Sequence, residues 1–310
     1  RDMSRMNLFN KLNNNKSLNE ALIQTFKNFS PDLVVLGHAD KIHINTLNEF
    51  RAINKNIKII EWSVDNYFLD NTENKFKARS SVIDAFFITN ADQNIKSCLG
   101  TSNSISFFPN IFDKSIESMK IFEKSEYSYD IFYALSFGVG TGKLKSIKSD
   151  YDREIYLDLI SNEYPEIKTN FFGYNGIQPV WGHSFENELA KSPISLNLSR
   201  KPYLKYYSSD RISQYLGNGS CVFVDINSKL DDLFNKEEVI FYDSNDHVDF
   251  GKKVLKMVEN INSAKEVAKK GWNRGHINYN EKIITNYFLD IAFNKKPTRE
   301  YSWPIHQYFQ

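Results

Sequence analysis

The stretch LNLSRKPYLKYYSSDRISQYLGNGSCVFVD, residues 196–225, decides the fold. It predicts an apolar strand, a polar and aromatic loop, one helix, and a second apolar strand. Ser209 and Asp210 are favourable N-cap residues for that helix, and Gly217 and Gly219 are typical of a helix end. Short strands that are apolar throughout are typical of a parallel sheet covered by helices. The stretch therefore predicts one strand–helix–strand unit of an α/β fold.

The loop and helix start of this stretch also carry positive charge. Arg200, Lys201 and Arg211 lie around the predicted first turn. A helix start presents free N–H groups and the positive end of the helix dipole, which suits a diphosphate group. The plain alternative is a capped helix with a solvated basic face. We expect an anion site here because the strand end, the loop, the helix start and the cations converge.

The same alternation of strands and helices extends over the rest of the chain. In the first half we expect helices near 18–30, 43–54, 72–82 and 91–98, and strands at 32–37, 58–64, 85–89 and 104–110. In the second half we expect strands at 129–138, 168–174, 194–199, 220–225 and 239–243. The helices of that half are expected near 151–163, 184–191, 209–217, 229–234, 246–261, 263–273 and 279–292.

Two successive series of this kind predict an α/β protein with two Rossmann-like, doubly wound domains and a cleft between them. The expected divisions are an N-terminal domain at 1–112, a charged linker at 113–128, a C-terminal domain at 129–292, and a tail at 293–310. We expect the last helix to pack back toward the N-terminal half. A helix precedes the first strand, so we also expect one or more βα units upstream and an N-terminal domain without its first strand.

Composition excludes several classes of protein. The 39 basic and 38 acidic residues nearly cancel, so no overall field favours nucleic acid. The chain has two cysteines, Cys98 and Cys221, in no metal or redox spacing, and no apolar run reaches the roughly 18 residues of a membrane-spanning helix. The polar start RDMSRMNLFNKLNNN does not resemble a signal peptide. We expect a cytoplasmic protein, with peripheral contact at the inner face of the membrane left open.

A glycine-rich segment, FGVGTGKLK at 137–145, follows the first strand of the second half. Glycines let a backbone approach a ligand closely, and a lysine there can neutralise phosphate. The spacing does not match a Walker loop. The alternatives are a phosphate-binding turn and a plain flexible turn. The residues concerned are Gly138, Gly140, Thr141, Gly142 and Lys143.

Residues 206–225 resemble the donor-binding segment of GT-B glycosyltransferases. The likeness is to the CgeB-like family, which has a "glycosyl transferases group 1" C-terminal domain. The pattern is a helix with an acidic or amide residue, a turn of small residues with a Gly, and an apolar strand, and it reads here RISQYLGNG followed by SCVFVD. Similarity continues in DDLFNKEEVIFYDSNDHVDFGKKV, AKKGWNRGHINYN, PDLVVLGHAD and DIFYALSFGVG, and covers most of 30–290.

The resemblance implies a nucleotide-sugar donor held by the C-terminal domain, with no cofactor and no metal. Gln214 stands where the family usually has a Glu that binds the donor ribose. Tyr206 stands at the earlier Glu of the E-x7-E pattern, so that acid is absent. Tyr174 stands where the nucleobase packs. The donor-binding residues that this implies are the segment Gly138, Gly140, Thr141, Gly142 and Lys143, together with Tyr174, Ser199, Arg200, Tyr206, Ser208, Ser209, Asp210, Arg211 and Gln214.

The N-terminal domain is expected to bind the acceptor. His38 and Asp40 follow one predicted strand and Asp65 follows the next, where α/β sheets bind ligands. Any of the three is a candidate catalytic base, and each also fits a plain loop or capping role. We interpret His183 as a turn residue. The acidic pairs at 231–232 and 237–238 are interpreted as solvated charges, so no metal ligand is expected.

Three functions remain open on the sequence. The first is a glycosyltransferase that moves a sugar from a nucleotide-diphosphate donor to a glycan, lipid-linked or other hydroxyl acceptor, independently of metal, in bacterial surface polysaccharide synthesis. The second is a sugar-nucleotide epimerase on the same scaffold, which would need more carboxylates and histidines near the donor sugar. The third is a non-catalytic module that binds nucleotide sugars. The first explains the most features.

Overall fold

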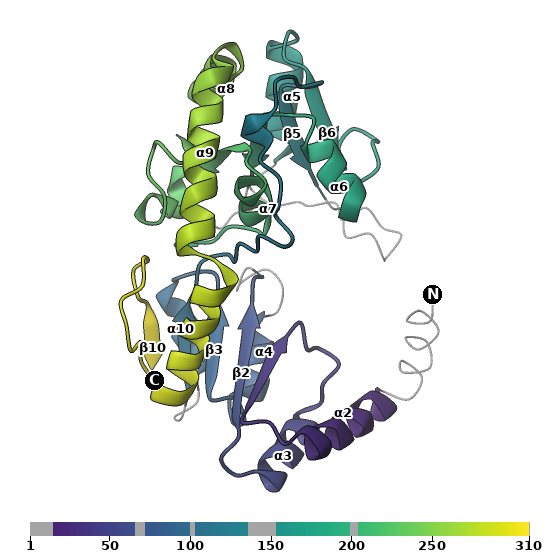
Figure 1. Cartoon of the computed structure of the whole chain (residues 1–310), viewed down its shortest axis with the longest axis vertical. Helices are drawn as coiled ribbons and strands as arrows, with labels where there is room; N and C mark the ends of the chain where they lie inside the picture. Colours follow the sequence, from purple (N-terminus) through teal and green to yellow (C-terminus); the bar gives the residue numbers. More distant parts are fainter. Residues whose placement is uncertain (1–14, 66–71, 100–102, 136–152, 199–203, 310) are drawn as a thin grey trace. The chain divides into compact units, whose positions relative to one another are not determined.

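A computed structural model of the chain describes residues 15–65, 72–99, 103–135, 153–198 and 204–309. These residues form two compact units (Figure 1). Unit 1 comprises the chain up to Phe108 together with Asn286–Glu300 and Ile305–Gln310, and unit 2 comprises Pro109–Thr285 and Tyr301–Pro304. Each unit is built on its own sheet, so the predicted pair of Rossmann-like α/β domains is confirmed.

The sheet of unit 1 has the strand order β1-β2-β3-β4-β10. Its first four strands are parallel, as predicted, with bounds Leu33–Gly37, Lys58–Ser63, Ala85–Ile88 and Ser104–Phe107. The sequence did not predict β10, Gln307–Phe309, which pairs antiparallel with β4. The helices with residues in this unit are α2 Lys16–Phe29, α3 Ile44–Ile53, α4 Thr72–Arg79, the 3-10 helix η1 Gln93–Cys98, and the later turns of α10 Glu281–Asn294.

Aromatic packing holds the helices of unit 1 to each other and to the sheet. Phe26 of α2 stacks on Phe50 of α3 with ring centroids 4.2 Å apart. Phe288 of α10 lies 4.0 Å from Phe87 of β3, centroid to centroid, and both rings are buried. The last helix therefore packs onto the N-terminal half of the chain, as predicted, because its later turns present aromatic residues to the sheet.

The sheet of unit 2 is parallel throughout, in the order β6-β5-β7-β8-β9. Its strands in chain order are β5 Ile131–Ala134, β6 Thr169–Phe172, β7 Ile194–Asn197, β8 Cys221–Asp225 and β9 Ile240–Tyr242. The helices are α5 Glu154–Glu163, α6 Gly182–Leu189, α7 Arg211–Gly217, α8 His247–Glu259, α9 Ile261–Asn278, the first turns of α10, and the 3-10 helices η2 Ile121–Glu123, η3 Ile226–Ser228 and η4 Leu230–Asp232.

The three central strands of this sheet, β5, β7 and β8, are buried along their whole length. This burial explains why β5 and β8 are mostly apolar without alternation, whereas β7 reads ISLN and also buries Ser195 and Asn197. Because all five strands are parallel, their carboxyl ends meet at one edge of the sheet, where open α/β sheets bind ligands.

The segment 113–128, interpreted above as a linker, belongs to unit 2 by its contacts. Ile121 of η2 is buried, and the ring of Phe122 lies 6.1 Å from that of Trp272 on α9. The segment is therefore part of the packed surface of unit 2. Within the described residues, no helix has both the length and the apolar character required to cross a membrane.

Candidate functional site

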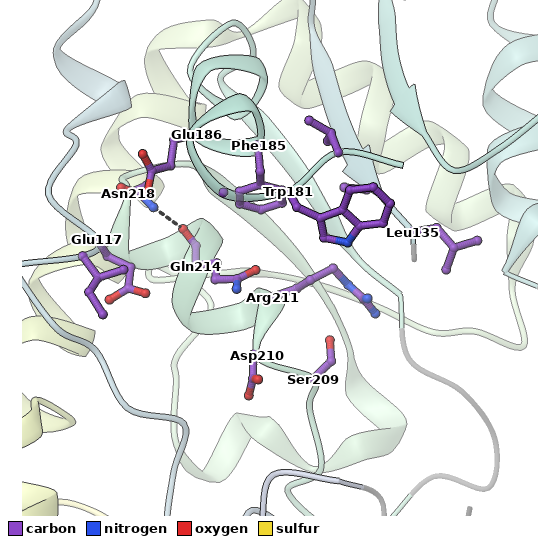
Figure 2. A pocket seen from close by; sticks show the side chains of 14 residues that line it. Glu117, Leu135, Trp181, Phe185, Glu186, Ser209, Asp210, Arg211, Gln214 and Asn218 are labelled. Carbon is purple, nitrogen blue, oxygen red and sulfur yellow. Dashed lines mark hydrogen bonds between the residues drawn. The ribbon is translucent and has the colours of Figure 1, made fainter. Parts of the chain in front are cut away.

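A pocket of about 450 Å³ opens beside the carboxyl end of β5 in unit 2 (Figure 2). Four segments of the chain line it: 116–117 before β5, 134–135 at the end of β5, 180–186 around the start of α6, and 209–218 around α7. The side chains of Trp181 and Phe185 lie on one side of it, and those of Ser209, Arg211 and Gln214 on the other (Figure 2). The pocket therefore has an aromatic wall and a polar wall.

Arg211 places a guanidinium group at the carboxyl edge of the sheet. One of its terminal nitrogens donates a hydrogen bond to the carbonyl of Leu198, just beyond β7, at 2.8 Å. The guanidinium carbon lies 5.5 Å from the centre of the Tyr133 ring on β5. These two contacts fix the cation between the ends of two neighbouring strands. A fixed arginine at a strand edge is well suited to bind phosphate oxygens.

Several buried polar atoms near this edge have no hydrogen-bond partner within the described part of the chain. They are Oδ1 of Asn197, Oγ of Ser209, Nε of Arg211 and Oδ2 of Asp225. Asn197 and Asp225 end two neighbouring strands, and both residues are almost completely buried. An unpaired buried polar atom costs free energy, roughly 1–3 kcal/mol. All four atoms are sealed from solvent, and neither Asn197 nor Asp225 lines the pocket.

The aromatic wall is formed by α6 and the residue before it. The ring of Phe185 stacks on that of Tyr215 from α7, with an interplanar angle of 9° and 6.1 Å between centroids. Trp181 is 53% exposed although it lines the pocket. An exposed indole at a pocket offers a flat face to a sugar or a base. Neither residue was predicted from the sequence, although Trp181 and Phe185 lie at the start of the helix that was expected near 184–191.

The pocket also contains three carboxylates: Glu117, Glu186 and Asp210. Glu117 is buried, and this burial raises the pKa of its carboxyl above the usual value. Asp210 accepts a hydrogen bond from Nδ2 of Asn110 at 3.3 Å. Glu117 was not predicted as a site residue, because this residue lies in the charged segment 113–128 that was interpreted as a linker.

Four of the predicted donor-binding residues line this pocket: Ser209, Asp210, Arg211 and Gln214. The side-chain amide of Gln214 forms no hydrogen bond to any other described residue, so it is available to a ligand. Asp210 occupies the N-cap position of α7, as predicted, but its side chain makes no capping hydrogen bond. Gly219 follows the end of this seven-residue helix with a φ of 81°.

Three other predicted donor residues that the structure describes do not line the pocket: Tyr174, Tyr206 and Ser208. Ser208 is buried, and its hydroxyl accepts from Nδ2 of Asn197 at 2.9 Å. Tyr206 is also buried, has a φ of 64°, and donates its hydroxyl to Asp232 at 2.5 Å. The hydroxyl of Tyr174 donates to Asp158, and burial with this bond raises the pKa of Tyr174 to about 12. Gly138, Gly140, Thr141, Gly142, Lys143, Ser199 and Arg200 lie outside the described residues.

The three candidate bases of unit 1 lie at the carboxyl ends of two adjacent parallel strands. His38 follows β1 with a φ of 49°, and its ring lies 5.7 Å from that of Trp62. Asp40 forms an ion pair with Lys75 at 3.0 Å. Asp65 lies just beyond β2, and its backbone N–H donates to the Ser63 hydroxyl at 3.2 Å. The two strand ends are brought to one edge, as predicted.

No group of three or more His, Cys, Asp or Glu side chains is arranged to hold a metal ion in the portions of the chain that the structure describes. His183 is exposed and lies 3.4 Å from Glu186 on the first turns of α6.

A family model described as "Glycosyl transferase-like" matches residues 144–285, which lie in unit 2. No curated protein matches the chain in sequence.

Solved structures resemble the chain over most of its length. An alpha-glucosyltransferase in complex with UDP-glucose and DNA containing an abasic site has a TM-score of 0.62 at 11% identity, and the match covers 88% of this chain and 83% of that one. TarM has a TM-score of 0.59 at 12% identity, and the match covers 87% of this chain. The chain spans only 57% of the length of TarM. Anabaena HepE in complex with UDP and glucose has a TM-score of 0.56 at 9% identity, covering 87% of this chain and 78% of HepE. The chain therefore has the GT-B fold.

Proposed function

We propose that this chain is a glycosyltransferase that binds a nucleotide-diphosphate sugar in the pocket of unit 2 and transfers the sugar to a hydroxyl acceptor. The observation that carries the proposal is the pocket itself. It places a fixed arginine and an aromatic wall at the carboxyl edge of a parallel sheet. The glycosyl transferase-like match over 144–285 and the GT-B fold support the same function.

The walls of the pocket suggest how the donor is oriented. Arg211 would bind the diphosphate, and Lys143 and Arg200, which lie outside the described residues, are proposed as further cations. Trp181 and Phe185 would contact the nucleoside, because aromatic rings pack well against planar bases and sugars. Two of the solved structures with this fold contain UDP or UDP-glucose, which supports a donor of that class.

The chemical step would depend on stabilising the leaving group. As the bond between sugar and phosphate breaks, negative charge develops on the diphosphate, and a pre-positioned cation stabilises that charge. Arg211 is held in place by Leu198 and Tyr133 before any ligand binds. In an inverting reaction, one of His38, Asp40 or Asp65 would remove the proton of the acceptor hydroxyl.

We further propose that the transfer needs neither metal nor cofactor, because arginine and lysine would neutralise the diphosphate. The transferred group would be a hexose or a related sugar. The acceptor would be a glycan or lipid-linked hydroxyl in bacterial surface polysaccharide synthesis, and the enzyme would act in the cytoplasm or at the inner face of the membrane. These finer points extend the resemblance described for residues 206–225.

The test is incubation of the full chain with labelled UDP-, GDP- and ADP-sugars, with and without EDTA. Transfer to an acceptor, or slow hydrolysis of one donor that persists in EDTA, would support the proposal. Conversion of the donor sugar to its epimer would favour an epimerase on the same scaffold. Donor binding without any turnover would favour a non-catalytic binding module. Loss of all turnover in EDTA, restored by a divalent cation, would contradict the metal-independent mechanism.

A further inference from the structure

Glu117 brings a carboxylate to the pocket from outside the strand and helix units of the sheet. It lies in the segment before β5, yet it lines the same pocket as Gln214 of α7. The residue is 7% exposed. One of its oxygens, Oε2, accepts a hydrogen bond from the backbone N–H of Asp113 at 2.8 Å. The other, Oε1, accepts no hydrogen bond from any other described residue and is not among the sealed unpaired atoms, so it keeps some exposure on a residue that lines the pocket.

Packing alone does not explain an acid at this position. Among the described residues, no cation forms an ion pair with Glu117. Burial raises the pKa of its carboxyl, and the negative charges of Asp113 and Asp210 act in the same direction, so the ionised form costs stability at neutral pH. Ionisable groups that are perturbed in this way and lie in a pocket are candidates for function.

The segment that carries Glu117 is held firmly against α7. The backbone N–H of Met119 donates to Oδ1 of Asn218 at 3.1 Å, and that of Ile121 donates to the Asn218 carbonyl at 3.0 Å. Gly217 has no side chain at the point of contact, which allows Glu117 to approach the helix. The carboxylate is thus positioned before a ligand binds, as a specific contact requires.

The order of residues along α7 indicates which part of a ligand Glu117 would meet. Arg211 is the first residue of the helix, Gln214 lies one turn further, and Gly217, against Glu117, lies at the end. At about 1.5 Å per residue, Gln214 lies roughly 4.5 Å along the axis from Arg211. In Figure 2 Glu117 and Gln214 lie toward one end of the pocket, and Arg211 toward the other. A phosphate at Arg211 would therefore place the neighbouring ribose near Gln214 and Glu117.

We propose that Glu117 binds the ribose hydroxyls of the donor nucleotide through its free carboxylate oxygen. A carboxylate accepts hydrogen bonds strongly and donates none when ionised, so it matches a pair of hydroxyl groups. This assignment rests on the proposed function, since it requires a nucleotide in the pocket of unit 2. It also gives the site an acid from a different element, whereas the amide of Gln214 contributes no charge.

The test is a thermodynamic cycle between protein and ligand, measured by calorimetric titration. UDP, GDP and ADP are titrated into the wild-type chain, and the tightest of them is compared with its 2′-deoxy and 3′-deoxy counterparts. The same ligands are titrated into Glu117→Gln and into the control Glu123→Gln, an exposed acid of the same segment. No sugar is present in these ligands, so any hydroxyl effect arises from the ribose.

We expect wild type and Glu123→Gln to bind the ribonucleotide about 10- to 100-fold more tightly than at least one deoxy form, the range for a hydrogen bond to a charged group. In Glu117→Gln this difference should shrink to a few fold, while affinity for that deoxy form stays near the wild-type value. If Glu117→Gln keeps the full difference, the assignment of Glu117 is wrong although nucleotide binding stands. If the difference vanishes instead in Gln214→Ala, the amide makes the contact. If no nucleotide binds wild type, the proposed function and this assignment both fail.

Discussion

Gly217 and Glu117 approach each other so closely that a Cβ atom on Gly217 would lie 2.7 Å from the Cβ atom of Glu117. Real Cβ atoms do not tolerate such a distance, so one of the two segments would have to move. This contact joins the end of α7 to the segment before β5, and it determines where the carboxylate of Glu117 lies.

Gly217→Ala tests that contact. Alanine is normally favoured over glycine in a helix by about 1 kcal/mol, but overpacking typically costs about 1–3 kcal/mol. We expect a lower melting temperature and weaker nucleotide binding, because the segment that carries Glu117 is displaced. A variant that melts at or above the wild-type temperature and binds nucleotide normally would show that the contact is not tight.

The affinity for nucleotide should depend on the ionisation of Glu117. Burial raises its pKa, so as the pH falls the carboxylate takes up a proton before an ordinary glutamate does. As the pH falls through this raised pKa, wild type should lose affinity more steeply than Glu117→Gln. The nucleotide phosphate also titrates, and the comparison of the two proteins removes that contribution. Parallel pH profiles for the two would contradict the assignment.

Most of the fold could be predicted from the sequence because its strands are rich in apolar residues and regularly spaced between helices. The predicted strands at 58–64, 85–89 and 220–225 match β2, β3 and β8 closely. The sequence did not predict β10, because its pairing with β4 depends on a contact between residues about 200 positions apart. The helix expected near 91–98 is a 3-10 helix, Gln93–Cys98.

The site could be predicted in part. Arg211 was named because it follows capping signals that are local in the sequence, and Gln214 because residues 206–225 resemble the donor-binding segment of GT-B glycosyltransferases. Both line the pocket. Tyr206 was not predicted to be buried, because its place depends on Asp232, a partner 26 residues away. Glu117 was missed for the same physical reason. Its burial depends on the close approach of Gly217 and on the hydrogen bonds that Met119 and Ile121 of its own segment donate to Asn218.

The buried ion pair of unit 1 should be important for stability. Arg79 donates to Glu61 at 2.7 Å and to the carbonyls of Ala39 and Ile42, which hold the loop after β1. The loss of solvation on burial outweighs the charge and hydrogen bond of Arg79, so the pKa of the Glu61 carboxyl is raised. We expect Arg79→Ala to cost about 3–5 kcal/mol locally, because it leaves a buried carboxylate unpaired. The measurement is hydrogen exchange in residues 38–43 and in β2.

The control for that measurement is Lys16→Ala, which removes an exposed pair with Glu20 and should change stability by less than about 0.5 kcal/mol. Equal protection of the loop in wild type and Arg79→Ala would contradict the prediction.

The candidate bases of unit 1 can be separated by single substitutions. If the reaction inverts configuration, the alanine variant of the true base should lose about 10²–10⁴ in transfer rate, with unchanged donor affinity. We favour the His38 and Asp40 pair over Asp65. Transfer rates are measured with saturating donor, and donor binding is measured by titration. Near-normal transfer in all three variants would place the base elsewhere, or indicate a reaction that retains configuration without one.

The most direct test of the central claim is a calorimetric titration of nucleoside diphosphates into wild type and Arg211→Ala. Arg299→Ala serves as the control, because Arg299 is an exposed arginine of unit 1. We predict that wild type and the control bind one nucleoside diphosphate, and that a folded Arg211→Ala binds it about 10- to 100-fold more weakly, as loss of a charge-assisted hydrogen bond requires. Equal affinity in a folded Arg211→Ala variant would contradict the account and leave Arg211 as a structural cation.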